Sequence, residues 1–595
     1  MKKHFRHVSI LTGAAIMASS LAGCGNSVTT SDTATTTTQT TTTTTTETTT
    51  QTTTAIDTYD SATEAEYPTE AEYSVEAEYP VEAAPMAPQE SACTSAADAV
   101  TGFFSSNKNT AATAEGCYVY EDYWDDSYCP VPYNTESYGK PEENGFFLSQ
   151  VQPLSTFAAD VDTASYANVR RMIESGYGED SIDPEAVRPE EFINYFSYDL
   201  NSPKRGEKFG VTTEVSTCPW NKDHQLMFVG LKAEDQFDGD MPKSNLVFLI
   251  DVSGSMTSEN KLPLLQKAFK ELVDNLPGDG TVSIVTYASK EDVILSGEKM
   301  SNKRAIKNAI SRLSAGGSTA GERGMQMAYE IAEENFIEGG NNRVIMATDG
   351  DLNVGISDPD DLEDFISKKK DSGIYLSVLG FGTGNYKDDK LERLADCGNG
   401  NYSYIDSMTE ARKVLVDEMS STLVTVAKDV KFQVEFNPAT VNGYRLIGYE
   451  NRQMDAVDFN NDAKDGGEIG AGHTVVALYE IIPAGSKSAI DLKYQTVSGS
   501  DSDDYATIKI RYKEPDEDKS KLLTYVVDGE FFNENAGENL AFASLVSEFA
   551  MLIGDSDYAG DITYSDIMKA YKKLDNTDDY KDEFYNLVRM VEKRS

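Results

Sequence analysis

One short apolar run, followed by oxygen-bearing side chains at alternate positions, constrains the fold of this chain more than any other feature. The run Leu246–Ile250 is too short for a helix and rich in strand formers, which predicts a strand buried on both faces of a parallel sheet. Asp251, Ser253 and Ser255 follow it directly. Open α/β sheets bind ligands beyond the carboxyl ends of their strands, and a carboxylate with two hydroxyls there suits Mg²⁺ or Mn²⁺. A short Asp/Ser loop is also typical of a helix cap, so the triplet alone leaves both interpretations open.

Two further segments favour the metal site. Residues 315–321 form a glycine loop ahead of a helical pattern, and residues 343–351 form a second apolar strand that ends in carboxylates. Together with the triplet, these segments resemble the metal-ion-dependent adhesion site of von Willebrand factor type A domains, over roughly residues 244–427. The resemblance places the five positions of that site, in the family's order, at Asp251, Ser253, Ser255, Thr319 and Asp349.

The resemblance also implies how such a site works. In these domains the two serines bind the cation directly, the threonine does so in the ligand-ready state, and the aspartates act largely through water. Mg²⁺ demands octahedral oxygen coordination and gives up its waters reluctantly. With few direct carboxylates the cation stays electrophilic, and one position is left open for a Glu or Asp of a protein partner.

Helical and strand patterns alternate regularly around these motifs. Between residues 262 and 424 the alternation, which ends in a helix at about 409–424, predicts a doubly wound, mainly parallel α/β sheet. This is the Rossmann-like architecture of the von Willebrand A domains that the motifs resemble. Short strands within 211–232 and at 430–436, 444–449, 474–482, 488–494 and 507–512 predict a β-sandwich that flanks the metal domain or is interrupted by it. From residue 533 to 594, apolar residues at helical spacing predict a small C-terminal helical region.

These patterns divide the chain into six segments. We expect a lipoprotein signal peptide at 1–23, a low-complexity Thr/Glu-rich tether at 24–133, an N-terminal region of helices then strands at 134–240, a von Willebrand A domain at 241–427, a β-sandwich region at 428–515 and a C-terminal helical region at 516–595. Segments at 154–166, 194–198, 458–462 and 467–473 resemble the YfbK-type family of bacterial von Willebrand A proteins. That likeness covers nearly everything from residue 134 onward.

The N-terminus carries the pattern of an exported lipoprotein. A basic start and a short apolar core precede Leu-Ala-Gly and Cys24, which resemble a bacterial lipobox, where the cysteine becomes the lipidated first residue. Because a cleaved core this short does not span a bilayer, we expect the lipid at Cys24 to be the membrane anchor, on the extracytoplasmic face of the cell membrane. The threonine run and Glu-Ala-Glu-Tyr repeats that follow bury too little apolar surface to fold, which predicts a disordered, extended tether.

Two other loops allow more than one interpretation. Asp160, Asp162 and Ser165 resemble a second metal loop, although Asp162 or Thr163 is as well placed to cap the helix that follows, and we favour the cap. The glycines at 380–384 fail the spacing of a nucleotide-binding loop and predict a turn at the end of a strand.

The cysteines remaining after lipidation are odd in number. Because five cannot all pair within one molecule, at least one thiol is free or pairs between molecules, and the sequence does not assign the pairing. They are Cys93, Cys117, Cys129, Cys218 and Cys397.

Charge and residue usage narrow the function. The formal net charge of −47 disfavours nucleic acid as a partner. After the signal region only His224 and His473 occur, far apart, and the sequence has no H-E-x-x-H, G-x-S-x-G or phosphate-binding loop. We therefore expect a protein that is not an enzyme.

The combined interpretation is a membrane-anchored binding protein whose Mg²⁺ (or Mn²⁺) site captures an acidic group on a protein partner. The alternative is a structural subunit of an envelope complex that docks without its metal. A third hypothesis, a metal-dependent hydrolase with Asp349 or Asp351 as base, is the least favoured, because nothing in the site requires bond breaking.

Overall fold

The computed structural model describes residues 136–139, 142–235, 242–289, 291–317, 322–350, 359–384, 386–490, 492, 502–515 and 517–595. The predicted lipidation site at Cys24, the predicted tether, Thr319 and the cysteines at 93, 117 and 129 lie outside these residues. None of the described helices is long and apolar enough to cross a membrane.

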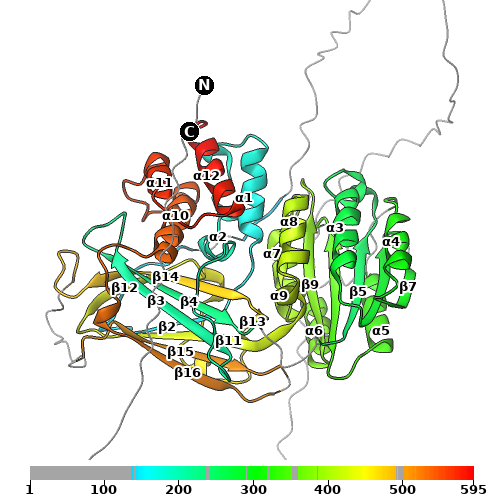
Figure 1. The fold of residues 1–595 in the computed structure, drawn as a ribbon, viewed down its shortest axis with the longest axis horizontal. Helices are drawn as coiled ribbons and strands as arrows, with labels where there is room; N and C mark the ends of the chain where they lie inside the picture. The colour runs from blue at the N-terminus through cyan, green and yellow to red at the C-terminus, as the bar shows by residue number, and fades with distance from the viewer. Residues whose placement is uncertain are drawn as a thin grey trace, which may run out of the picture. The chain divides into compact units, whose positions relative to one another are not determined.

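A six-stranded sheet forms the core of the α/β domain (Figure 1). Across the sheet the strands are β10 (Tyr402–Ile405), β9 (Ile374–Phe381), β8 (Asn341–Thr348), β5 (Ser244–Asp251), β6 (Gly280–Tyr287) and β7 (Asp292–Lys299). All neighbours pair in parallel except β7, which runs antiparallel to β6 at one edge. The predicted mainly parallel sheet is confirmed.

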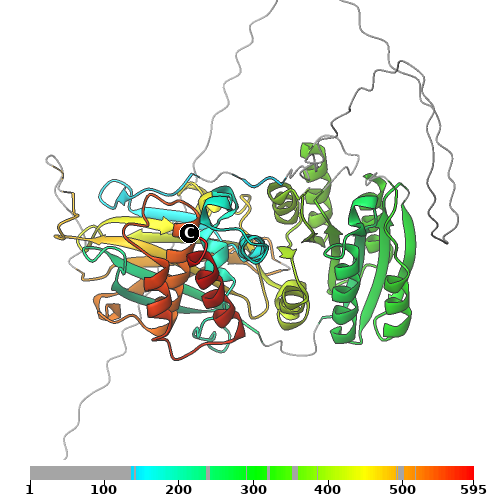
Figure 2. The ribbon, with the colours of Figure 1, turned by 90° about the horizontal axis from the view of Figure 1, so that it is seen from above.

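Helices cover both faces of this sheet, as Figure 2 shows from above. On one face lie α3 (Leu262–Asn275), α4 (Lys303–Ser311) and α8 (Met408–Arg412). On the other lie α5 (Glu322–Glu334), α6 (Pro359–Asp371) and α7 (Asp388–Cys397). The single helix predicted at 409–424 is divided, because a π-helical turn at Lys413–Asp417 separates α8 from α9 (Met419–Leu423).

Strand β5 explains its own apolar sequence. Leu246, Phe248 and Ile250 point into the core beneath α3, whereas Val247 and Leu249 point into the core beneath α5. Every residue of β5 is buried, so both faces of the strand need apolar side chains. The carboxyl end of this strand is therefore held rigidly at one edge of the sheet.

A β-sandwich is built from strands on both sides of the α/β domain in sequence. One sheet has the order β1 (Phe147–Leu148), β12 (Val441–Ile447), β14 (Thr474–Pro483), β4 (Gln225–Ala233) and β3 (Phe209–Thr217). The other has the order β13 (Gly467–Gly470), β11 (Thr425–Phe436), β15 (Ala506–Lys513) and β16 (Lys521–Val527), with β2 (Leu154–Ala158) also paired to β11. The α/β domain is thus inserted between β4 and β11. The strand predicted at 488–494 is absent from its described residues 488–490 and 492.

The sheet that contains β4 and β14 is a middle layer. Along β14, Val475 and Ala477 face the second sheet, whereas Val476 and Leu478 face a helical layer. Phe436 and Tyr444 stack between the two sheets with ring centroids 4.1 Å apart. The helical layer consists of α1 (Ala164–Glu174), α2 (Pro189–Asn194), α10 (Glu538–Ile553), α11 (Tyr564–Tyr571) and α12 (Asp579–Glu592).

The cap predicted for helix α1 is confirmed in position but lacks its side-chain hydrogen bond. Thr163 occupies the N-cap position, but its side chain makes no capping hydrogen bond. Asp162 instead accepts a hydrogen bond from the Tyr402 backbone N–H at 2.9 Å and pairs with Arg452 at 3.3 Å. The second metal loop is not supported, because Asp160 also pairs with Arg452, at 3.1 Å, and the Ser165 hydroxyl donates to the Ala186 carbonyl.

These contacts belong to a larger cluster where α7 of the α/β domain meets the segment around α1 and α2 and the loop after β12. We call it the carboxylate junction. Arg452 contacts four carboxylates, and Arg188 contacts three, of which Glu392 is shared. The members of the cluster are Asp160, Asp162, Arg188, Glu191, Asp388, Glu392, Asp396 and Arg452.

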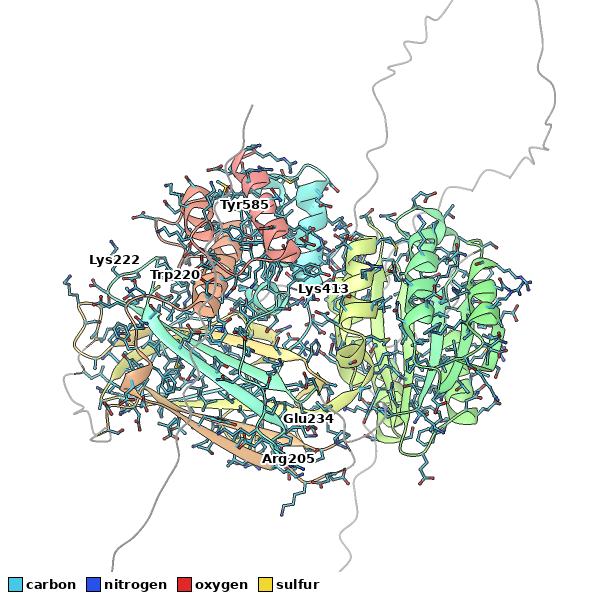
Figure 3. The ribbon with its side chains drawn as sticks, viewed as in Figure 1. Arg205, Trp220, Lys222, Glu234, Lys413 and Tyr585 are labelled. Carbon is cyan, nitrogen blue, oxygen red and sulfur yellow. The ribbon has the colours of Figure 1, made fainter. Side chains whose placement is uncertain are left out.

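Buried charge also joins the α/β domain to the helical layer. The Arg170 guanidinium of α1 lies 2.6 Å from Asp406 and 2.8 Å from Glu410. The Lys413 ammonium lies 4.5 Å from the centre of the Tyr195 ring, at the boundary where Figure 3 labels it. The inserted domain is therefore held to the rest of the fold by side-chain contacts as well as by the chain itself.

Candidate metal centre

Two carboxylates meet at one edge of the α/β sheet. Asp251 ends β5 and Asp349 follows β8, and these strands are parallel neighbours in which Ile250 lies opposite Ala347. Both aspartates are completely buried. The sheet topology brings together two residues that are far apart in sequence, as predicted from the two apolar strands.

The loop after β5 folds back on Asp251. The Ser253 backbone N–H donates to Asp251 Oδ1 at 2.7 Å, and the Thr348 hydroxyl lies 3.4 Å from Oδ2. The hydroxyl oxygens of Ser253 and Ser255 lie 2.9 Å apart. Ser253 is buried and Ser255 is exposed, so the hydroxyl pair reaches from the carboxylates to solvent.

The glycine loop docks directly on this site. Gly316 donates its N–H to the Val252 carbonyl at 2.8 Å, and Gly254 donates to the Gly317 carbonyl at 3.0 Å. Gly317 has φ +88°, and a Cβ there would lie 2.3 Å from the Ser289 hydroxyl oxygen, so glycine is required. Gly316 and Gly317 thus contact the segment that follows Asp251. Thr319 comes two residues after Gly317 and lies outside the described residues.

A lysine that the sequence analysis missed enters the same site. The Lys261 ammonium lies 2.8 Å from Asp349 Oδ2, and the lysine side chain is only 7% exposed. Lys261 immediately precedes α3, so its position in the sequence gives no sign that it reaches a carboxylate after β8. Its charge belongs to the electrostatics of the site.

Burial raises the pKa of Asp251 to about 6, and the nearby Asp349 carboxylate adds to the rise, although the Ser253 N–H opposes it. The donors are all oxygens, two carboxylates and two hydroxyls, which is the set that Mg²⁺ or Mn²⁺ prefers. A divalent cation would also relieve the repulsion between the buried carboxylates. Asp251, Ser253, Ser255 and Asp349 therefore fit a hard cation.

A second group of acids lies on the opposite side of the α/β domain, where it borders the sandwich. Carboxylate oxygens of Asp429, Asp465 and Glu468 lie within 4.8 Å of one another. Lysines already pair with two of them, Lys513 with Asp429 at 2.5 Å and Lys370 with Asp465 at 2.8 Å. Burial also raises the pKa of Glu468, the third carboxyl, well above its ordinary value. A proton there and the two ion pairs leave little charge for a cation to neutralise, so the group is a poorer candidate than the carboxyl ends of β5 and β8.

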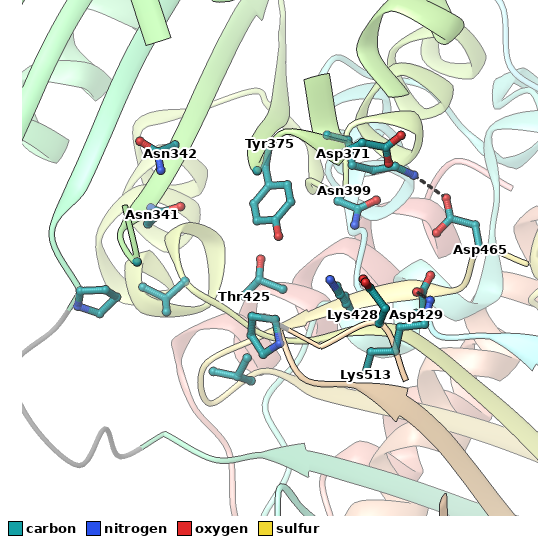
Figure 4. Close-up of a pocket in the computed structure, with 18 of the residues that line it drawn as sticks. Asn341, Asn342, Asp371, Tyr375, Asn399, Thr425, Lys428, Asp429, Asp465 and Lys513 are labelled. Carbon is teal, nitrogen blue, oxygen red and sulfur yellow. Dashed lines mark hydrogen bonds and ion pairs between the residues drawn. The ribbon is translucent and has the colours of Figure 1, made fainter. Parts of the chain in front are cut away.

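Asp429 and Asp465 line a pocket of about 850 Å³, shown in Figure 4. Tyr375 and Asn399 of the α/β domain face Thr425 across it. The lining mixes lysines with carboxylates, and the Arg343 guanidinium donates to the Thr425 hydroxyl oxygen at 3.1 Å. The pocket is polar and is separate from the metal centre.

The remaining candidate residues lie elsewhere. His224 contacts Glu480 at 2.5 Å within the sandwich, and burial lowers the pKa of His473 to about 4. Cys218 and Cys397 carry free thiols. The glycines at 380–384 end β9, with Gly382 and Gly384 at positive φ, which confirms the predicted turn.

The fold and the site define a von Willebrand factor type A domain within a larger chain, and the family comparisons agree. The model of the von Willebrand factor type A domain matches residues 245–418, and a second von Willebrand factor model matches residues 132–228. Domains of this class commonly carry a metal-ion-dependent adhesion site and mediate protein interactions. The model described as "Uncharacterized protein YfbK, C-terminal" matches residues 421–593.

The chain is 40% identical to YfbK of Escherichia coli over 472 residues, which is 77% of this chain and 81% of the relative. It therefore belongs to the YfbK family. Mouse voltage-dependent calcium channel subunit alpha-2/delta-2 is 25% identical over 239 residues, 38% of this chain and 20% of that protein. A von Willebrand factor type A structure from Catenulispora acidiphila is 16% identical, with TM-score 0.37, covering 66% of this chain and 91% of that one.

Proposed function

We propose that this protein is a cell-surface binding protein whose Mg²⁺-dependent adhesion site captures a Glu or Asp of a protein partner. The cation would be held by Ser253, Ser255 and Thr319, with Asp251 and Asp349 acting largely through water. A lipid on Cys24 would anchor the chain on the extracytoplasmic face of the membrane. Binding, without a catalytic step, would be its role.

The observation that carries this proposal is the arrangement at the carboxyl ends of β5 and β8. Two buried aspartates lie beside the loop that carries two serine hydroxyls, whose oxygens are 2.9 Å apart. Of these four side chains, only Ser255 is exposed. A cation held at such hydroxyls faces solvent with few direct negative ligands. It would retain affinity for an anionic oxygen from a partner, in a partly desolvated contact.

The metal is tested by calorimetric titration of the full chain with Mn²⁺. Asp251→Ala should abolish measurable binding while leaving the fold intact, because the hydroxyls and an Asp349 already paired with Lys261 do not neutralise the cation. Circular dichroism checks the fold. Unchanged Mn²⁺ affinity in a folded Asp251→Ala protein would contradict the proposed site.

The partner is tested by affinity capture from envelope extracts, with Mg²⁺ and with chelator. Chelator should release the partner, restored Mg²⁺ should rescue binding, and Thr319→Ala should weaken the partner more than the metal. Capture that is indifferent to chelator and to Thr319→Ala would favour the docking subunit instead. Hydrolysis of generic ester or peptide substrates would contradict a role in binding alone.

The anchor is tested separately. A Cys24→Ala protein should lose lipidation and leave the detergent phase in which membrane proteins partition. If it remains there in full, the anchor lies at another position.

A further inference from the structure

Lys261 is the feature of the metal centre that the adhesion-site pattern does not include. Its ammonium reaches Asp349 Oδ2 at 2.8 Å, and the lysine side chain is 7% exposed. Burying an ammonium costs free energy unless it is paired. The pairing with the buried Asp349 carboxylate therefore accounts for the burial of Lys261. The cation that binds at this edge would share Asp349 with a resident positive charge.

A glycine makes room for the path of the Lys261 side chain. It passes over Gly382, where a Cβ would lie 2.3 Å from Cε and 2.4 Å from Cγ of Lys261. Gly382 has φ +81°, a backbone conformation that favours glycine, and its carbonyl accepts a hydrogen bond from the Tyr404 hydroxyl at 2.5 Å. The turn after β9, which the sequence analysis left without a role, makes the space that lets Lys261 enter the site.

The charges of the site show what the lysine does. Among the described residues of the site, Asp251 and Asp349 carry two negative charges when ionised, which a divalent cation would balance. The Lys261 ammonium adds one positive charge to that described set. Such a centre binds its cation less tightly on its own and favours an added carboxylate, because the carboxylate brings it back to neutrality.

We propose that Lys261 determines the specificity of the metal centre by coupling the cation to an acidic ligand. The proposal rests on the proposed function to the extent that the centre binds a divalent cation. Coupling between two ligands is reciprocal, so a carboxylate should strengthen cation binding by the factor by which the cation strengthens carboxylate binding. Lys261 would set the size of that factor.

The test is calorimetric titration of the full chain with Mn²⁺, with and without acetate as the carboxylate probe. Lys261→Met keeps an apolar stem over Gly382 and removes the charge. It should raise Mn²⁺ affinity by at least about tenfold without acetate, because a repelling charge is gone. Acetate should raise Mn²⁺ affinity in the wild type and should lose most of that effect in Lys261→Met.

A readout without metal accompanies the titration. In the metal-free chain Lys261→Met should lower the melting temperature, because Asp349 loses its ion pair beside Asp251. Lys307→Met is the matched control, since this lysine of α4 pairs with Asp274 and its side chain is 35% exposed. The control should leave Mn²⁺ affinity and the acetate effect unchanged.

Gly382→Ala provides a second variant, which keeps the lysine but blocks its path. It should shift Mn²⁺ affinity and the acetate effect in the same direction as Lys261→Met, and it tests the idea even if the methionine variant does not fold. If the wild type binds Mn²⁺ and folded Lys261→Met binds it with equal or lower affinity, the role of Lys261 is overturned but the metal centre is not. A wild type that binds no Mn²⁺ overturns the metal centre as well. A partner that binds without metal, while the acetate effect depends on Lys261, overturns only the proposed function.

Discussion

The metal centre and the carboxylate junction both gather buried acids around the same α/β domain, yet they neutralise them differently. At the junction Arg452 contacts Asp160, Asp162, Glu392 and Asp396 at 2.6–3.3 Å. At the metal centre Asp349 pairs with Lys261, and the two carboxylates lie near the hydroxyls of Ser253 and Ser255, of which Ser255 is exposed.

This difference shows that the number of acids does not identify a cation site. Each guanidinium group has several N–H donors in a planar fork and can pair with several carboxylates. At the junction the protein's own arginines therefore neutralise the acids. Burial also raises the pKa of Glu191 to about 8 and that of Asp388 to about 7, so bound protons remove further charge there. The metal centre offers hydroxyl oxygens and access to solvent, which are what a cation and its ligand require.

The largest expected effect comes from removing the Arg452 guanidinium of the junction. Arg452→Met should destabilise the protein by about 3–5 kcal/mol, because it leaves several buried carboxylates without their partner. Urea unfolding measures the loss. Arg393→Met is the control, since Arg393 pairs with Glu363 at 2.6 Å but is 61% exposed, and it should cost less than about 1 kcal/mol. Equal losses would mean that the junction is not held by its arginine.

The second-largest expected effect comes from adding Mn²⁺, which should bind at the metal centre and not at the junction. Mn²⁺ at one hundred times its dissociation constant should stabilise the folded chain by about 2.7 kcal/mol, because it binds the folded state alone. Asp251→Ala should abolish this stabilisation, whereas Asp388→Asn at the junction should keep it. Thermal unfolding with and without Mn²⁺ measures both. Loss of the Mn²⁺ effect in Asp388→Asn would show that the junction takes part in cation binding.

The smallest effect is the pH dependence of the junction. In the folded protein the raised pKa values of Glu191 and Asp388 lie above those of unfolded carboxyls, at about 4. The folded state therefore binds more protons between about pH 4 and pH 8, and these groups make stability fall as pH rises through that window. The slope should be at most about 1.4 kcal/mol per pH unit for each carboxyl.

Asp388→Asn should make that slope shallower when urea unfolding is repeated between pH 5 and pH 8. Tyr402→Phe is the control, because it removes only a hydroxyl that donates to Asp388 at 2.8 Å and keeps the carboxyl. It should lower stability without flattening the slope. A slope that is unchanged in Asp388→Asn would contradict protonation at the junction.

The parts of this fold that sequence patterns predict are those where the reason for a residue is local. The apolar run of β5 and the Asp-Ser-Ser loop after it follow from burial on both faces and from the position of ligands in α/β sheets. Asp349 follows from the same logic applied to β8.

The parts that were missed depend on partners far away in the chain. Lys261 and Asp349 are 88 positions apart, and Arg452 and Asp160 are 292 positions apart. The role of Asp162 was missed for that reason, since it looks like a capping residue until Arg452 and Tyr402 are placed beside it. Nothing within one helix or strand signals such pairs.

The insertion of the α/β domain between β4 and β11 has a mechanical consequence. Both crossings lead into interior strands, β4 between β14 and β3 in one sheet and β11 beside β15 in the other. A pull exerted through the metal centre would be divided between two covalent paths, each ending in a strand flanked by hydrogen-bonded neighbours. Tension would then be shared between both sheets of the sandwich.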